Sequence, residues 1–569
     1  MPFTCLWNRS ASCGSADFWR ASKYLLVERM TPTLPPTLAT LLGPEAYPHA
    51  VDGVELVSTH VSWVLLAGEY AYKVKRPVRY PCIDLTSLER RRFLCEEELR
   101  LNRRFAPELY IDLCRVVTAN GGARIERRKS AGGVDGDSGG EMVLDYAVRM
   151  RRFSRVDELD RLLDGHRIEP HELATFGHAL AQTHAGLPAA PAASSWGRPE
   201  EVQAQLLRNL LECADAAAGF GSSMEVLSLR HPLQAKLTAS VEWMTARRSA
   251  GRIRECHGDL HSRNIVRVRG RLVAFDCLEY DPAFRWIDTA DEVGFLTSDL
   301  SARGRPLHAH AFRGGYLAES GDYHACRVLG LYEAHRALVR AKVAALSVVQ
   351  NNEAGAREAA RGEHLRLVTL AAGALAPKTP RLLLMSGLSG SGKTWLARQL
   401  AVRLSAVHIR SDVERKRRSG LREFAPSHSR VGDDLYSAEA TDALYEGLAR
   451  AAEDVLSGGI TAIVDATFLK RAQRTSFVEL TARCRAAAYL VWCEAPESVL
   501  RARITERSRA GRDPSEANLD VLMWQSARAE PPTAGERLDV IRVDTMRSDS
   551  LDLTLQRIGG VRPELPDQP

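Results

Sequence analysis

The chain has 569 residues, of which 45% are hydrophobic and 26% charged, which is ordinary for a globular protein and long enough for several domains. Its 77 basic and 71 acidic residues leave a net charge of +6, an excess too small to indicate a nucleic-acid partner by itself. No run approaches the roughly 18 uninterrupted apolar residues of a membrane span, so we expect no membrane partner.

Residues 1–29 lack the apolar core of a secretion signal, and Met30 reads like a natural start, so we expect a disordered extension before it. The 11 cysteines include no C-x-x-C pair and no zinc-ligand spacing. We therefore expect reduced thiols and a cytoplasmic location, with Cys256 and Cys277 as small packing residues.

The first domain, expected over residues 30–376, begins with a β-rich lobe. Residues 51–78 predict a strand, a turn at Ala67-Gly68 and a second strand. A helix is predicted over residues 85–104, where leucines recur near helical spacing.

Two further strands are predicted over residues 109–117 and 141–150. They flank a glycine-rich polar insert that we expect to be a mobile hairpin tip. From residue 153 to about residue 376 the pattern is mostly helical, apart from a short β stretch around residues 265–276.

Residues 377–381 contain two prolines and are expected to be a linker between the two domains. A second domain is expected over residues 382–560, where apolar strands alternate with helices. This alternation predicts a parallel sheet with helices on both faces. The expected strands are residues 381–386, 406–412, 459–467 and 487–495.

The sequence GLSGSGKT at residues 387–394 fits the phosphate-binding pattern G-x-x-x-x-G-K-[ST] in full. Its glycines let backbone N–H groups face phosphates, and the following helix points its positive end at them. Lys393 is expected to reach the β- and γ-phosphates of ATP, and Thr394 to hold Mg²⁺. The predicted nucleotide-binding residues are Gly387, Leu388, Ser389, Gly390, Ser391, Gly392, Lys393 and Thr394.

Two carboxylates follow strands of this sheet at the edge where ligands bind. Asp412 is suited to accept the proton of an attacking hydroxyl, and Asp465 to contact Mg²⁺ through water. Downstream, Arg503, Arg507 and Arg512 lie in a charged segment that could neutralise the transferring phosphoryl group. Arginines in a charged helix are also common on a solvated face.

On these features the second domain resembles the small P-loop kinases that include gluconate kinase, polynucleotide 5′-hydroxyl kinases and zeta-toxin-like enzymes. The resemblance covers about residues 380–550. It depends on the phosphate loop, the D-x-x-R of Asp412 and Arg415, the strand end VDATF and the arginine-rich segment.

The first domain contains the sequence HGDLHSRN, which has the D-x-x-x-x-N of a kinase-type catalytic loop. Asp259 is expected to accept the proton of the acceptor hydroxyl, and Asn264 to ligate Mg²⁺. A short β stretch then delivers Asp276 as a second metal ligand. The alternative is a buried hydrogen-bond network of these residues.

Lys73 and Lys75 lie on one face of their strand because side chains alternate along it. One of them is expected to neutralise the α- and β-phosphates; Lys73 fits the hydrophobic-x-Lys form of V-A-I-K better. On the next helix, Glu98 is expected to hold that lysine, with Glu97 as the alternative.

These motifs resemble aminoglycoside phosphotransferase-like kinases over most of residues 50–350. The chain as a whole is similar to two-domain bacterial proteins that join this fold to a P-loop kinase. The resemblance implies a bilobal, protein-kinase-like α+β domain followed by an α/β P-loop domain. Two departures from protein kinases, Cys277 in place of F-G and no G-x-G-x-x-G before Lys73, argue against a protein substrate.

Five carboxylates after Asp276 form an acidic group that could bind a cationic acceptor. Alternatively, they could cap the N-termini of helices and hold the residues that bind a metal. They are Glu279, Asp281, Asp288, Asp291 and Glu292.

The leading hypothesis is an ATP-dependent phosphotransferase with two MgATP sites and small-molecule hydroxyl acceptors. In one alternative, one domain is a nucleotide sensor that regulates the other. In a second alternative, the basic run ERKRRSGLR after Asp412 serves a nucleic-acid end kinase, although no aromatic platform accompanies it. The sequence indicates neither acceptor nor the oligomeric state.

Overall fold

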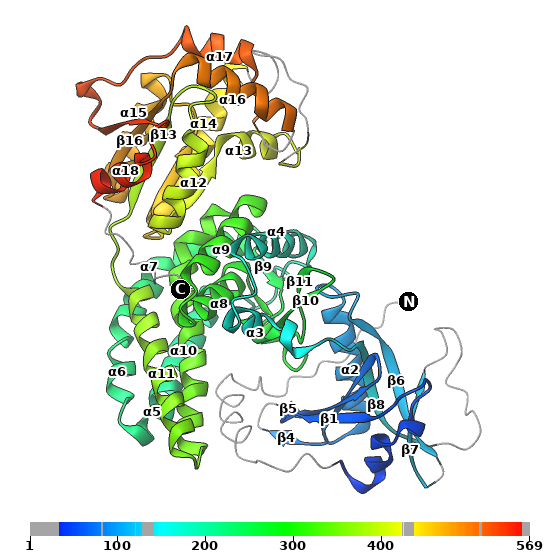
Figure 1. The fold of residues 1–569 in the computed structure, drawn as a ribbon. Helices are drawn as coiled ribbons and strands as arrows, with labels where there is room; N and C mark the ends of the chain where they lie inside the picture. Colours follow the sequence, from blue (N-terminus) through cyan, green and yellow to red (C-terminus); the bar gives the residue numbers. More distant parts are fainter. Residues whose placement is uncertain are drawn as a thin grey trace. The chain divides into compact units, whose positions relative to one another are not determined.

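The structure is a computed structural model that describes residues 34–80, 83–119, 121–127, 142–423, 425, 437–510 and 515–559. The expected extension at residues 1–29 and most of the glycine-rich insert lie outside the described residues. The chain divides into two compact units, which are treated separately below and whose elements are labelled in Figure 1. The first comprises Met1–Ile168, Gly186–Arg303 and Leu331–Leu375, and the second Glu169–Ala185, Gly304–Gly330 and Ala376–Pro569.

The first unit begins with a six-stranded antiparallel sheet in the order β1-β2-β3-β8-β6-β7. The 3₁₀ helix η1 (Pro36–Leu42) packs on one face of this sheet, and α2 (Leu88–Asn102) on the other. Helix α2 begins where the Ser87 hydroxyl accepts a 3.2 Å hydrogen bond from the backbone N–H of Arg90. The strands are β1 (Val54–Ser58), β2 (Ser62–Ala67), β3 (Tyr70–Lys75), β6 (Tyr110–Ala119), β7 (Gly122–Arg127) and β8 (Val143–Arg151).

The prediction of a single strand before the Ala67-Gly68 turn is wrong, because β1 and β2 are separate antiparallel strands. A tight turn joins them: the backbone N–H of Thr59 donates to the carbonyl of Ser62 at 2.8 Å. The Thr59 hydroxyl also accepts a 2.9 Å hydrogen bond from the Ser62 N–H. This local side-chain bond ends the strand without glycine or proline, the residues that the prediction depended on.

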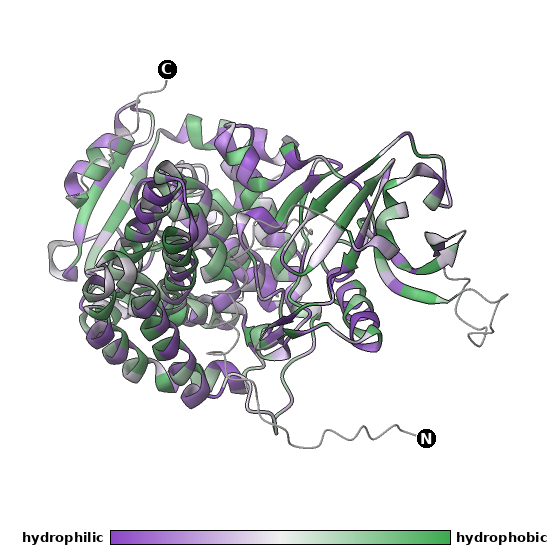
Figure 2. Ribbon diagram, turned by 90° about the horizontal axis from the view of Figure 1, so that it is seen from below, coloured by the Kyte–Doolittle hydropathy of each residue, from purple (hydrophilic) through white to green (hydrophobic). Residues whose placement is uncertain are grey.

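The rest of the first unit is mainly helical, as predicted. In α5 (Pro199–Ala217), Leu206, Leu210 and Cys213 are buried at helical spacing. Figure 2 shows such alternation of hydrophobic and hydrophilic stretches along the helices. The other elements of this part are α3 (Leu159–Asp164), α6 (Ser223–Leu227), α7 (Arg230–Ser249), α8 (Thr289–Ala302), α10 (Cys326–Gln350), α11 (Ala354–Leu375), and the short pairs β9 (Ile253–Glu255) with β12 (Trp286–Asp288) and β10 (Ile265–Val268) with β11 (Arg271–Ala274).

The second unit contains a five-stranded parallel sheet in the order β14-β15-β13-β16-β17. Helices α12 and α18 pack over one face, while α14 lies against β13 and β15 and packs on α15. The strands are β13 (Arg381–Ser386), β14 (Val407–Arg410), β15 (Ala462–Asp465), β16 (Ala487–Glu494) and β17 (Asp539–Asp544). The helices are α12 (Lys393–Leu404), α13 (Ser411–Arg418), α14 (Ala438–Ser457), α15 (Arg471–Cys484), α16 (Glu497–Ala510), α17 (Leu519–Ser526) and α18 (Ser550–Ile558).

The fold class predicted from the sequence, α+β followed by α/β, is therefore confirmed. Strand β17 was not predicted, because as an edge strand it buries only Ile541 and Val543, with Arg542 between them and an aspartate at each end of the strand. No helix within the described ranges is long and apolar enough to cross a membrane.

The second unit also includes α4 (Pro170–Gly186) and α9 (Pro306–Ser320), which approach each other closely. A Cβ atom on Gly177 would lie 2.3 Å from the carbonyl oxygen of Phe312, and one on Gly315 would lie 2.1 Å from that of Ala174. Two glycines thus permit this helix pair.

Helix α9 carries His310, whose Nδ1 is buried and has no hydrogen-bond partner among the described residues. Burial, together with the nearby charges of Arg313 and His408, lowers the pKa of His310 to about 3. Below the ordinary histidine pKa of about 6.5, His310 is protonated in the unfolded chain but stays neutral in the folded unit. Acidification therefore lowers the free energy of unfolding.

We therefore expect the free energy of unfolding to fall by about 1 kcal/mol per pH unit between about pH 6 and pH 4 because of this residue alone. Thermal unfolding at about pH 7.5 and pH 5 should show a smaller loss of Tm for His310→Gln than for the unaltered chain. The exposed His231 provides the control variant His231→Gln. Equal losses of Tm in all three proteins would contradict the assignment.

Candidate active sites

The phosphate loop follows β13 and leads directly into α12. Gly387, Gly390 and Gly392 have φ values of 135°, 82° and 83°, which residues other than glycine rarely adopt. A Cβ on Gly387 would lie 2.5 Å from the carbonyl oxygen of Cys493, and one on Gly390 would lie 2.7 Å from that of Leu500. The glycines therefore allow the loop to curl at the N-terminus of α12, where backbone N–H groups attract anions.

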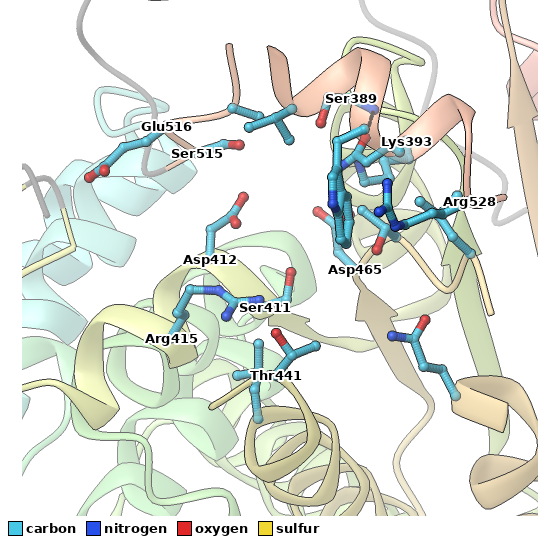
Figure 3. Close-up of a pocket in the computed structure, with 18 of the residues that line it drawn as sticks. Ser389, Lys393, Ser411, Asp412, Arg415, Thr441, Asp465, Ser515, Glu516 and Arg528 are labelled. Carbon is cyan, nitrogen blue, oxygen red and sulfur yellow. Dashed lines mark hydrogen bonds between the residues drawn. The ribbon is translucent and has the colours of Figure 1, made fainter. Parts of the chain in front are cut away.

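A cavity of about 540 Å³ opens beside this loop. Lys393, Asp412 and Asp465 all line it, so the structure brings together three residues singled out from the sequence. Figure 3 shows Asp412 on one side of the cavity and Lys393 with Asp465 on the other. Asp412 lies in the first turn of α13, and Asp465 is the last residue of β15.

The two carboxylate oxygens of Asp465 differ in whether they have a hydrogen-bond partner. Its Oδ2 lies 3.2 Å from Nε2 of His408, whereas its Oδ1 is buried and has no hydrogen-bond partner among the described residues. Burial alone would raise the pKa of Asp465, but the hydrogen bond from His408 and the charge of Lys393 lower it to about 2. An ionised carboxylate with a bare oxygen beside the phosphate loop fits an Mg²⁺ ion or its bound water.

The predicted arginines are placed differently from one another. Arg503 donates to the carbonyl of Gly390 and to the hydroxyl of Thr545, both at 3.2 Å, and so braces the phosphate loop. Arg507 donates to the carbonyl of Ala517 at 2.8 Å and does not line the cavity. Arg512 lies outside the described residues.

Among the residues of the cavity wall that were not predicted are Gln525 on α17 and Arg528 just beyond it. The Gln525 side-chain carbonyl accepts a 2.8 Å hydrogen bond from the backbone N–H of Ser389 in the phosphate loop. The guanidinium of Arg528 lies 4.8 Å from the ring centre of Trp524. No motif surrounds these residues, so only packing could reveal them.

Replacing Gln525 with alanine is expected to lower kcat/KM for ATP about 5- to 10-fold, because a buried N–H of the phosphate loop loses its acceptor. Gln525→Glu keeps an acceptor oxygen but adds a negative charge near the triphosphate, so it should raise the Kd for ATP further. ATP titration calorimetry and steady-state kinetics measure both effects. Equal affinity of both variants and the unaltered chain would contradict this role.

In the first unit, Lys73 lies between two carboxylates. Its Nζ is 2.5 Å from Oδ1 of Asp276 and 2.8 Å from Oε1 of Glu98. Burial alone would lower the pKa of Lys73, but Asp276 and Glu98 hold it well above its ordinary value. The structure thus pairs Lys73 with Glu98, as expected, and also with Asp276, which was expected only as a metal ligand.

Lys75 has a different environment, since its side chain is fully buried. It pairs with Glu98 and with Glu279. The side chain of Asp276, in contrast, is 45% exposed. Lys73 is therefore the lysine connected to an open carboxylate, whereas Lys75 lies in the interior.

The hairpin of β10 and β11 brings Asn264 and Asp276 to the same end. Asn264 directly precedes β10, and its carbonyl accepts a 2.9 Å hydrogen bond from the N–H of Phe275. Asp276 has a φ of 64°, an unusual value for a residue with a side chain, and its N–H donates to the Tyr110 hydroxyl at 3.0 Å. Such strain at a polar residue is typical of functional sites.

Asp259 is held by its own loop. The Asn264 amide donates to Oδ2 of Asp259 at 2.9 Å, and Nε2 of His261 lies 3.3 Å from the same oxygen. Burial alone would raise the pKa of Asp259, but His261, His257 and Arg336 hold it well below its ordinary value. The carboxylate is thus ionised, which a proton acceptor requires.

The carboxylates of the acidic group after Asp276 form ion pairs and hydrogen bonds within the first unit. Asp288 forms a buried ion pair with Arg247, and Asp291 with Arg336. Glu292 accepts from the N–H groups of His257 and Gly258, at 3.0 and 2.7 Å, and so shapes the catalytic loop. With Glu279 paired to Lys75, and Asp281 capping a 3₁₀ turn, these contacts favour the helix-start and supporting role over binding of a cationic acceptor.

Comparison with known proteins identifies one domain and a relative of similar length. Residues 382–532 match the family model described as AAA domain, which confirms the predicted P-loop domain. "Uncharacterized protein Rv2004c" of Mycobacterium tuberculosis (strain ATCC 25618 / H37Rv) is 27% identical over 486 residues, which are 85% of this chain and 92% of that protein.

Solved structures align with each part of the chain. A sugar kinase from Janibacter sp. HTCC2649 aligns with 32% of this chain and 96% of its own, at 18% identity and a TM-score of 0.27. An aminoglycoside phosphotransferase from Alicyclobacillus acidocaldarius aligns with 61% of this chain and 95% of its own, at 15% identity and a TM-score of 0.34.

Proposed function

We propose that this protein is an ATP-dependent phosphotransferase with two nucleotide sites, each of which transfers the γ-phosphoryl group of ATP to a hydroxyl group of a small molecule. One observation carries the proposal: Lys393, Asp412 and Asp465 line a single cavity beside a phosphate loop, and Oδ1 of Asp465 is buried with no hydrogen-bond partner among the described residues. A cation for the phosphates, a base for the hydroxyl and a carboxylate for Mg²⁺ are the parts that phosphoryl transfer needs.

In the second unit, Lys393 and the N–H groups of the loop would hold the β- and γ-phosphates. As the acceptor oxygen bonds to the γ-phosphorus and the bond to ADP breaks, Asp412 would take the hydroxyl proton. Thr394 and Asp465 would hold Mg²⁺, which offsets charge on the phosphate oxygens when bound. The predicted role of Arg507 and Arg512 in neutralising the transferring group would require Arg507 to leave the carbonyl of Ala517 and enter the cavity.

In the first unit, Lys73 would neutralise the α- and β-phosphates and Glu98 would orient it. Asp259 would accept the acceptor proton, because it is ionised and held by Asn264. Asn264 and Asp276 would hold Mg²⁺: they lie at one end of a hairpin, and Asp276 is partly exposed. These roles are the proposal for this site.

A small-molecule acceptor is favoured over nucleic acid because two cations of the basic run after Asp412 are engaged within the second unit, which leaves Arg418 and Arg422 as its exposed cations. Lys416 is buried and lies 3.0 Å from Glu516. Arg417 pairs with Glu414 and donates to the carbonyl of Ala318. These cations are engaged, so they do not form an open surface for a phosphate backbone.

The test is transfer from ATP labelled on the γ-phosphate to sugars, polyols, aminoglycosides and 5′-hydroxyl oligonucleotides, with the full-length chain. Asp259→Asn and Lys393→Ala should each remove transfer to a different acceptor set, and the double variant should remove all transfer. Nucleotide binding without transfer to any acceptor would instead indicate a sensor. A preference for oligonucleotides would indicate an end kinase.

A further inference from the structure

A second cavity adjoins the one beside the phosphate loop. It measures about 840 Å³ and lies along α14 and α15, the helices that pack against each other behind β15. The two cavities share part of their walls, so they are adjacent. The shared residues are Thr441, Tyr445, Lys470, Gln473 and Trp524.

This adjacency bears on the size of the acceptor. The first cavity alone, at about 540 Å³, is within the usual range for a small ligand, and it must also admit the γ-phosphate. A monosaccharide placed with a hydroxyl at Asp412 would leave the second cavity empty. A longer acceptor could occupy both, with its reactive end at Asp412 and its remainder along α14 and α15.

The charges of the second cavity bear on the chemistry of that remainder. Its carboxylates are Asp442, Glu446, Glu453 and Glu479. Its cationic side chains are Arg450, Lys470 and Arg483. Four of these seven groups form two ion pairs, Glu453 with Arg483 at 3.3 Å and Glu446 with Arg450 at 3.8 Å. A wall with one more negative than positive group does not favour a chain of phosphates.

The uncharged part of the wall fits hydroxyl groups and ring faces. Thr441, Gln473 and Ser476 offer hydroxyl and amide groups, which can both donate and accept hydrogen bonds. Trp524 lines both cavities and is 42% exposed, with the guanidinium of Arg528 over one face of its indole ring. An indole beside hydroxyl and amide groups is suited to a sugar ring, which has apolar faces and a polar rim.

We propose that the acceptor of the second unit is an oligosaccharide-like polyhydroxylated molecule, uncharged or bearing amino groups, whose distal rings lie in the cavity along α14 and α15. This inference rests on the proposed phosphoryl transfer by the second unit. It adds the class of the acceptor and a site for the part of it that does not react.

The test uses the full-length chain with Asp259→Asn, in which only the second unit is expected to act. Ala472 is exposed on α15 and lines only the second cavity, so Ala472→Trp would obstruct it. Ala482 is exposed on the same helix and lines neither cavity, which makes Ala482→Trp the matched control. The probes are glucose, maltose, maltotetraose, kanamycin and a 5′-hydroxyl decanucleotide.

We expect kcat/KM to rise at least about 10-fold from glucose to the longer saccharides or kanamycin, since more of the wall is engaged. Ala472→Trp should remove that gain, while transfer to glucose and the Kd for ATP stay unchanged, and Ala482→Trp should change neither. Equal effects of the two tryptophans, no gain with acceptor length, or a preferred decanucleotide would overturn the inference. Transfer that survives Lys393→Ala would instead refute the proposed function of this unit.

Discussion

Replacing Lys393 with alanine is expected to lower phosphoryl transfer by the second unit about 10²- to 10³-fold. The ammonium group lies in the same cavity as Asp412 and Asp465 and forms no ion pair within the described part of the chain. Its charge is therefore available to offset the triphosphate, and loss of one such group from a preorganised site typically costs this much.

The measurement is transfer of labelled phosphate in full-length protein that also carries Asp259→Asn, which removes the contribution of the first unit. Lys378 is exposed before β13 and supplies the control Lys378→Ala, which should retain full activity. Lys393→Arg should recover little, because the glycine loop leaves space fitted to a compact ammonium group. Full activity of Lys393→Ala would show that this loop does not hold the phosphates.

Asp259→Asn is expected to lower transfer by the first unit about 10²- to 10⁴-fold, the usual contribution of a general base. Asparagine has the same shape and can keep a hydrogen bond with Asn264, but its amide does not accept a proton. ATP binding should therefore remain, with kcat reduced and KM for ATP little changed.

This variant is tested in full-length protein carrying Lys393→Ala. Asp215 is exposed on α5 and provides the control Asp215→Asn. A reduced affinity for ATP with unchanged kcat would assign Asp259 to nucleotide binding instead of proton transfer. Unchanged kcat and unchanged affinity would mean that Asp259 neither accepts the proton nor binds the nucleotide.

The sequence was sufficient where chemistry depends on neighbours along the chain. The glycines of the phosphate loop follow an apolar strand and precede a helix, so the order of residues alone indicates how the backbone must curl. The spacing of Asp259, Asn264 and Asp276 likewise predicted a loop and a short β stretch, which in the structure is the antiparallel pair of β10 and β11.

Other features depend on contacts between distant residues and could not be predicted. Gln525 reaches Ser389 across more than a hundred residues, and nothing in its local sequence indicates an acceptor for a phosphate loop. The alternation of strand side chains placed Lys73 and Lys75 on one face, but only packing shows that Lys75 is enclosed by Glu98 and Glu279. The charged edge strand β17 lacks the apolar run of its neighbours.

The most direct measurement is the number of MgATP molecules that the full-length chain binds, determined by calorimetry. The account predicts two per chain, with one remaining in Lys393→Ala, one remaining in Lys73→Ala, and none in the double variant. A single site in the unaltered chain, or two sites in every variant, would contradict the claim that each unit has its own phosphate-binding lysine.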